Sequence, residues 1–280
     1  MESHAMTGQG RGRVDYDECG IGPAVVLVPG SCSTGAVWRP VIAAWGSQLR
    51  AVTTSLPGYG GTDERRTASD PSIAYEAEAV ESVIRRAGGR VHLVGHSFGG
   101  LVALAVALRN RVALASLAII EAPAMGVLQK PEEEPHYRAF RQMSEAYFAA
   151  FERAQPEAVE MMMDFYGGAG SFASLPGRVR AYAVATTATN ILDWASAYDF
   201  PLTAEALAKV QLPTLVVLGD RSNPAVQRAS VLLSKQIGDA MLEAIGGAAH
   251  FMITTHAGEV ARLIATHVYR AEERSKTPAQ

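Results

Sequence analysis

The stretch that decides the fold is Val91 to Gly100, which reads Val-His-Leu-Val-Gly-His-Ser-Phe-Gly-Gly. An apolar, β-branched run stops at Gly95, and a run rich in alanine, leucine and valine with helical character begins directly after Gly100. The sequence therefore predicts a strand, a tight turn and a helix that follow one another without a loop. Ser97 lies at the bend.

The five residues Gly95-His96-Ser97-Phe98-Gly99 fit the pattern G-x-S-x-G. Both glycines are needed because the turn is too sharp for side chains next to the strand and the helix. Such a turn pushes the serine hydroxyl out of the sheet edge, and the backbone N–H of Phe98 points to the same place. We therefore predict Ser97 as a nucleophile and Phe98 as the backbone donor to an oxyanion.

This pattern in its strand-to-helix context resembles the nucleophile turn of the α/β-hydrolase superfamily, and the resemblance covers nearly the whole chain. It implies an α/β fold with a mostly parallel eight-stranded sheet flanked by helices and with an inserted helical cap. The segment 125–205 fits such a cap because it has little strand signal and apolar residues at helical spacing. Its methionine and aromatic stripes are more typical of a cap core than of substrate contacts. We therefore expect a core domain of residues 1–124 and 206–280, and a cap of residues 125–205.

Length and composition suit one large α/β domain, since the chain has 280 residues of which 48% are apolar. The net charge of −3, without a block of basic residues, argues against nucleic acid as a partner. No apolar run is long enough to span a bilayer, and the first 13 residues lack the hydrophobic centre of a signal peptide. We expect a cytoplasmic protein. Its two cysteines, Cys19 and Cys32, form no disulfide framework and no metal-binding spacing.

A second oxyanion donor is expected after the buried strand 24–28, which ends in Pro29-Gly30-Ser31-Cys32. The resembling family has His-Gly-x at this place, and the backbone N–H of that loop completes its oxyanion hole. Here proline replaces the histidine while the glycine is kept. The resemblance therefore assigns the donor to the backbone of Ser31, with Cys32 as the neighbouring alternative.

Two carboxylates compete for the acid of the site. Glu121 directly follows the predicted strand 112–120, and catalytic groups in open parallel sheets gather at the carboxyl ends of strands. The family commonly places the acid a few residues after the next strand, but Ser222 and Asn223 stand there and only Asp220 is acidic. Some branches of the superfamily take the acid from the position matched by Glu121. On position alone, we favour Glu121 and keep Asp220 as the alternative.

The predicted base is His250, which follows the glycine-rich exit from the last strand, 240–245. The chain order Ser97, acid, His250 is that of the family. A histidine can accept the serine proton while a carboxylate holds its tautomer, so the trio suits acyl transfer through an acyl-enzyme. We predict a carboxylesterase that acts on a small-molecule ester or acyl substrate. The resemblance implies no cofactor and no metal.

Other activities remain open because the shape of the cap decides among them. The same trio serves thioesterases, amidases, lactonases, carbon–carbon bond hydrolases, perhydrolases and lyases, and the fold also serves as a non-catalytic ligand-binding receptor. A serine nucleophile disfavours the alkyl-ester route of the related dehalogenases and epoxide hydrolases. The oligomeric state, monomer or dimer, is not readable from the sequence.

Overall fold

The computed structural model describes residues 6–8 and 11–276. Most of the N-terminal stretch on which the expectation about a signal peptide rests lies outside these residues. The strands are β1 (Met6–Gly8), β2 (Arg11–Val14), β3 (Asp17–Cys19), β4 (Ala24–Val28), β5 (Arg50–Thr53), β6 (Val91–His96), β7 (Leu114–Ile120), β8 (Thr214–Gly219) and β9 (Ala240–Ile245).

The main sheet has seven strands in the order β3-β5-β4-β6-β7-β8-β9. Only the edge pair β3–β5 is antiparallel, and the other neighbours run parallel. The prediction of a mostly parallel sheet is confirmed. The described part of the chain has one strand fewer in this sheet than the eight expected, because β1 and β2 pair with each other in a separate two-stranded sheet.

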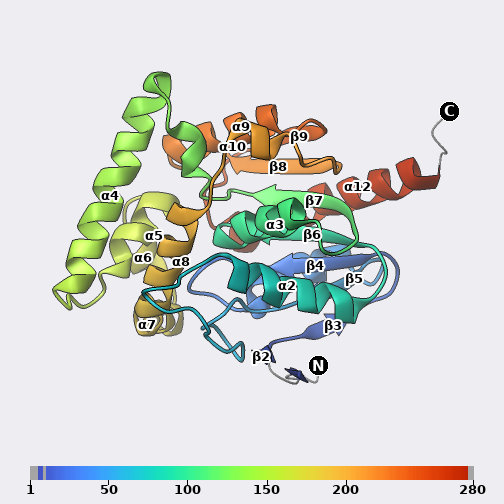
Figure 1. Ribbon diagram of the computed structural model, residues 1–280, viewed down its shortest axis with the longest axis horizontal. Coiled ribbons are helices and arrows are strands. Elements are labelled where there is room, and N and C mark those ends of the chain that lie inside the picture. Colours follow the sequence, from blue (N-terminus) through green and yellow to red (C-terminus); the bar gives the residue numbers. More distant parts are fainter. Residues whose placement is uncertain (1–5, 9–10, 277–280) are drawn as a thin grey trace.

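Helices cover both faces of the sheet, as predicted. They are α1 (Arg39–Trp45), α2 (Ala74–Ala87), α3 (Phe98–Arg109), α10 (Pro224–Gln236), α11 (Met252–Thr255) and α12 (Ala257–Lys276). Alternate residues of β4 show the two sides: Val26 and Val28 pack in one core with α2, α3 and α10, whereas Val25 and Leu27 pack in another with α1 and α12. Figure 1 shows α2 and α3 in front of the sheet.

A group of helices lies between β7 and β8 in the chain and stands together at one end of the sheet (Figure 1). We call this group the helical insertion. It contains α4 (Glu134–Glu152), α5 (Val159–Gly167), α6 (Ser171–Ser174), α7 (Gly177–Ala185) and α8 (Thr187–Asp199), and the short α9 (Ala204–Leu207) follows it. The helices α7 and α8 follow each other with a break at Thr186, because the hydroxyls of Thr186 and Thr187 bond back to carbonyls of the preceding turn.

Candidate active site

The turn between β6 and α3 consists of Ser97 alone. Its backbone has φ 54° and ψ −130°, which a residue with a side chain adopts only when its surroundings hold it there. A Cβ atom at Gly95 would lie 2.1 Å from the carbonyl oxygen of Gly99, and one at Gly99 would lie 2.3 Å from that of Pro29. Both glycines are therefore required by close packing. The helix begins at Phe98 and not at Leu101, because one residue suffices for the turn.

His250 lies between the other two predicted residues of the site. Its Nε2 is 2.9 Å from Ser97 Oγ, and its Nδ1 is 2.8 Å from Glu121 Oε2. The histidine and the glutamate are buried, and the serine is half-buried. The structure thus brings together side chains that are 24 and 129 residues apart in sequence.

Glu121 is held by several donors besides His250. It directly follows β7 with φ 46°, and its Oε1 accepts the backbone N–H of Gly219 (2.7 Å) and the hydroxyl of Ser222. Burial opposes its ionisation, but the hydrogen bonds from His250, Ser222 and Gly219 outweigh this and lower the pKa of Glu121 below its ordinary value. The carboxylate is therefore ionised at neutral pH and fixed in orientation.

Asp220, the alternative acid, has a different environment. Its Oδ1 accepts the backbone N–H of Gly247 at 2.7 Å, at an exposed turn. The Nδ1 of His250 points to Glu121 instead. The structure therefore places Glu121 beside His250 and assigns Asp220 to the turn that leads to it.

The two predicted oxyanion donors flank Ser97. Phe98 is the first residue of α3, where backbone N–H groups have no partner within the helix. The loop after β4 approaches from the other side: a Cβ atom at Gly30 would lie 2.8 Å from the Cβ of Ser97. Ser31 lines the same cavity as Ser97, and its hydroxyl donates to Asp193 Oδ2 at 2.5 Å.

His96 is a supporting residue that the sequence analysis missed. Its Nε2 is 2.8 Å from the carbonyl oxygen of His250, and the two imidazole rings are 5.0 Å apart. Burial, together with the neighbouring His250, lowers the pKa of His96 to about 3. The ring is therefore neutral and can donate to the backbone that carries His250. Only its place in the G-x-S-x-G pattern marked it in the sequence.

A cavity of about 600 Å³ opens at Ser97 between the sheet and the helical insertion. Its wall is mainly apolar and includes Met125, Phe140, Met162, Met163, Trp194 and Phe251. Some of the methionines and aromatics that were more typical of a cap core than of substrate contacts thus face the cavity.

Tyr166 of α5 also lines this cavity beside His250, with their ring centres 4.8 Å apart. Its buried hydroxyl has no hydrogen-bond partner among the residues that the structure describes. Burial raises the pKa of Tyr166, so this hydroxyl keeps its proton. A bound molecule in the cavity would meet a hydrogen-bond donor here.

The described residues contain neither a cluster of metal-binding side chains nor a membrane-spanning helix. No group of three or more histidine, cysteine, aspartate or glutamate side chains is arranged to hold a metal ion within residues 6–8 and 11–276. Over the same residues, no helix has the length and apolar character needed to cross a membrane.

A family model described as "Alpha/beta hydrolase family" matches residues 25–263, which is most of the chain. The chain belongs to the alpha/beta hydrolase family. This confirms the family resemblance and the fold class predicted from the G-x-S-x-G turn. The match includes Ser97, Glu121 and His250.

Relatives and solved structures of this alpha/beta hydrolase agree with the assignment. A pimeloyl-[acyl-carrier protein] methyl ester esterase from Aeromonas salmonicida is 36% identical over 104 residues, which cover 37% of this chain and 39% of that protein. The polyketide synthase ThaQ from Burkholderia thailandensis is 26% identical over 275 residues, 91% of this chain but 12% of that protein. A thermophilic esterase structure from Thermogutta terrifontis matches with a TM-score of 0.77 at 18% identity, covering 97% of this chain and 99% of that one. The last match shows the fold alone.

Proposed function

We propose that this alpha/beta hydrolase is a serine carboxylesterase that works through an acyl-enzyme. The observation that carries the proposal is the continuous chain of contacts from Ser97 Oγ to His250 and from His250 to Glu121. An uncharged imidazole in this position accepts the serine proton, while the carboxylate holds the tautomer with hydrogen on Nδ1 and stabilises the cation that forms. The esterase names of relatives that match about a third of the chain also support an ester as the bond cleaved.

The reaction has two halves. Ser97 Oγ attacks the ester carbonyl carbon as its proton passes to His250 Nε2, and the developing oxyanion accepts the backbone N–H groups of Phe98 and Ser31. Collapse of this intermediate breaks the bond to the alcohol, which leaves with the proton from His250. A water molecule then gives a proton to His250 and attacks the acyl carbon. The bond to Ser97 Oγ breaks, His250 returns the proton to this oxygen, and the carboxylic acid is released.

Ser31 suits the second donor better than Cys32. The hydroxyl of Ser31 is fixed by its hydrogen bond to Asp193 Oδ2 at 2.5 Å, which holds this residue at the cavity beside Ser97. Cys32 itself is buried, and burial raises the pKa of its thiol to about 12, so it does not compete as a nucleophile. These contacts favour the assignment made from the resemblance.

The helical insertion serves in this proposal as the cap, with the domain division of 1–124 and 206–280 against 125–205. It supplies most of the apolar cavity wall, and a cavity of this size and polarity suits an apolar acyl group of medium size. The hydroxyl of Tyr166, which has no protein partner in the described structure, is available to an oxygen of the substrate. A closed apolar wall also excludes water from the charged intermediate.

The test is to incubate the purified protein with a fluorophosphonate and with p-nitrophenyl esters of increasing acyl length. We expect labelling of Ser97 and ester turnover, both lost in Ser97→Ala, with the best turnover at medium chain lengths. The matched control is Ser174→Ala, which changes an exposed serine of α6 outside the cavity wall. Absence of labelling at Ser97 in a folded protein would refute the esterase proposal and favour a ligand-binding role.

A further inference from the structure

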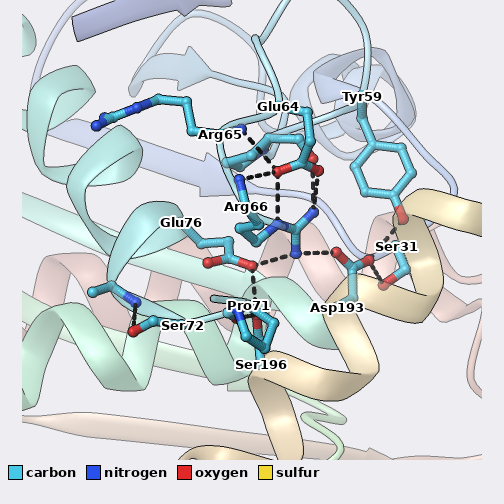
Figure 2. A network of polar contacts seen from close by, with 12 residues as sticks. Ser31, Tyr59, Glu64, Arg65, Arg66, Pro71, Ser72, Glu76, Asp193 and Ser196 are labelled. Atoms are coloured by element: carbon cyan, nitrogen blue, oxygen red, sulfur yellow. Dashed lines mark hydrogen bonds and ion pairs between the residues drawn. The ribbon is translucent and has the colours of Figure 1, made fainter. Parts of the chain in front are cut away.

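A buried ion cluster ties the helical insertion to the core on the side of the site where Ser31 lies (Figure 2). At its centre is Arg66, from the loop that follows β5, which is 4% exposed. Its Nη1 is 2.7 Å from Asp193 Oδ1 and 2.5 Å from Glu76 Oε1, and its Nη2 is 2.6 Å from Glu64 Oε2. Three carboxyl groups from three segments thus share one guanidinium.

The cluster holds one guanidinium and three carboxyl groups, so acidic groups are in excess. Burial raises the pKa of Glu76, despite the opposing effect of Arg66. Burial also raises the pKa of Asp193, which Arg66 and two hydroxyl donors counter. Arg66 contacts all three carboxyl groups, and Asp193 accepts hydrogen bonds from Arg66, Ser31 and Tyr59.

Asp193, on α8, joins the cluster to the predicted oxyanion loop. Its Oδ2 accepts the hydroxyl of Ser31 at 2.5 Å and the hydroxyl of Tyr59 at 2.7 Å (Figure 2). Its side chain is almost fully buried and also borders the cavity. The loop after β4 begins with Pro29, which has neither an N–H nor a polar side chain to fix it. The hydrogen bond to Asp193 is therefore a tether for Ser31 that comes from the helical insertion.

We propose that Asp193 is a positioning residue that holds Ser31 so that the Ser31 backbone N–H faces the oxyanion. The inference rests on the proposed esterase function. Preorganised donors act mainly on the charge that develops in the transition state. Loosening the tether should thus lower kcat, with little change in KM. It follows that the oxyanion hole, which lies in the core, is complete only when α8 is docked.

The main test compares Ser31→Ala, which keeps the backbone N–H but loses the tether, with Asp193→Asn and with the double variant. We expect Ser31→Ala to lower kcat roughly 10- to 100-fold with KM nearly unchanged, because one oxyanion donor is displaced but not removed. The double variant should lose little more than the worse single variant, since both act through one contact. Binding of a trifluoromethyl ketone, which mimics the oxyanion, should weaken in parallel with kcat.

Two controls separate positioning from a structural role. Tyr59→Phe removes another hydrogen bond from the same Asp193 oxygen and should lower the melting temperature while kcat is retained. Glu160→Gln changes an exposed carboxylate of the helical insertion, on α5 and outside the cavity wall, and should change neither. Ser31→Ala is expected to fold because the Arg66–Asp193 ion pair stays.

The outcomes distinguish the two proposals. If wild-type protein is not labelled at Ser97 by a fluorophosphonate, the esterase function itself fails. If wild-type protein is labelled and turns over esters, but folded Ser31→Ala and Asp193→Asn both keep kcat within about threefold of wild type, the positioning role is overturned and the cluster is structural only.

Discussion

Replacement of Glu121 by glutamine tests the proposed acid most directly. The two oxygens of Glu121 face different partners: Oε1 accepts from Gly219 and Ser222, and Oε2 faces His250. The glutamine amide has only one oxygen. If its NH₂ group faced the Gly219 N–H, two donors would meet without an acceptor. The amide oxygen therefore faces Gly219 and Ser222, and the NH₂ group faces His250 Nδ1.

This orientation forces the wrong tautomer on the histidine. With a donor opposite Nδ1, the ring proton moves to Nε2, and His250 can no longer accept the proton of Ser97. A change of tautomer in a Ser-His-Asp triad lowers kcat about 10⁴-fold in the best-studied case, which is about 5 kcal/mol of transition-state stabilisation. We expect Glu121→Gln to lose activity by this order. Folding should persist because the contacts to Gly219 and Ser222 remain.

The assay is steady-state hydrolysis of a p-nitrophenyl ester together with the rate of fluorophosphonate labelling. The matched control is Asp220→Asn, which changes a carboxylate that accepts the Gly247 N–H. We expect this variant to keep turnover within a few fold of wild type. If Asp220→Asn loses activity by orders of magnitude while folded Glu121→Gln keeps it, the assignment of the acid is wrong.

Three further predictions concern packing and pH. Gly30→Ala should lower turnover at least about tenfold, because its Cβ would meet the Cβ of Ser97 at 2.8 Å, whereas Gly177→Ala, with open space around it, should leave ester hydrolysis unchanged. The folded state holds the pKa of His96 at about 3, below the unfolded value near 6.5, so the unfolded chain binds its proton first on acidification. When the pH falls from 7.5 to 5, the unfolding free energy of the wild type should therefore decrease by about 2 kcal/mol more than that of His96→Gln, which lacks this group. Urea unfolding measures both values, and an equal decrease in the two proteins would contradict the prediction. Trp194→Ala, which removes a buried ring that stacks on Phe140, should lower the unfolding free energy by about 3–5 kcal/mol and shift the best substrate to longer acyl chains, as urea unfolding and an ester series would show.

The turn at Ser97 was predictable from sequence because the contacts that require its residues are local. Gly95, Ser97 and Gly99 are required by contacts within one turn, and the strand and helix on either side are strongly patterned. The choice between Glu121 and Asp220 was harder. Both follow parallel strands, and only the backbone at Glu121, with its positive φ, turns that carboxylate toward His250.

The ion cluster around Arg66 could not be predicted from sequence patterns. Arg66 stands in a run of charged residues that is typical of an exposed loop, yet it is almost fully buried. Asp193 lies 162 residues after Ser31, on a helix whose polar positions look like a solvated face. Buried charges of this kind become visible only when the partners from distant segments are placed together in space.

The tether between Ser31 and Asp193 also bears on how such enzymes can be recombined. The helical insertion of this chain looks like an interchangeable module, because it enters and leaves the core between two neighbouring strands, β7 and β8. Suppose that this insertion is replaced by one without a carboxylate at the place of Asp193. Ser31, Tyr59 and Arg66 then all lose their shared hydrogen-bond acceptor. A chimera with a new insertion therefore needs a carboxylate at the place of Asp193. Without one, its three partners in the core must be replaced as well.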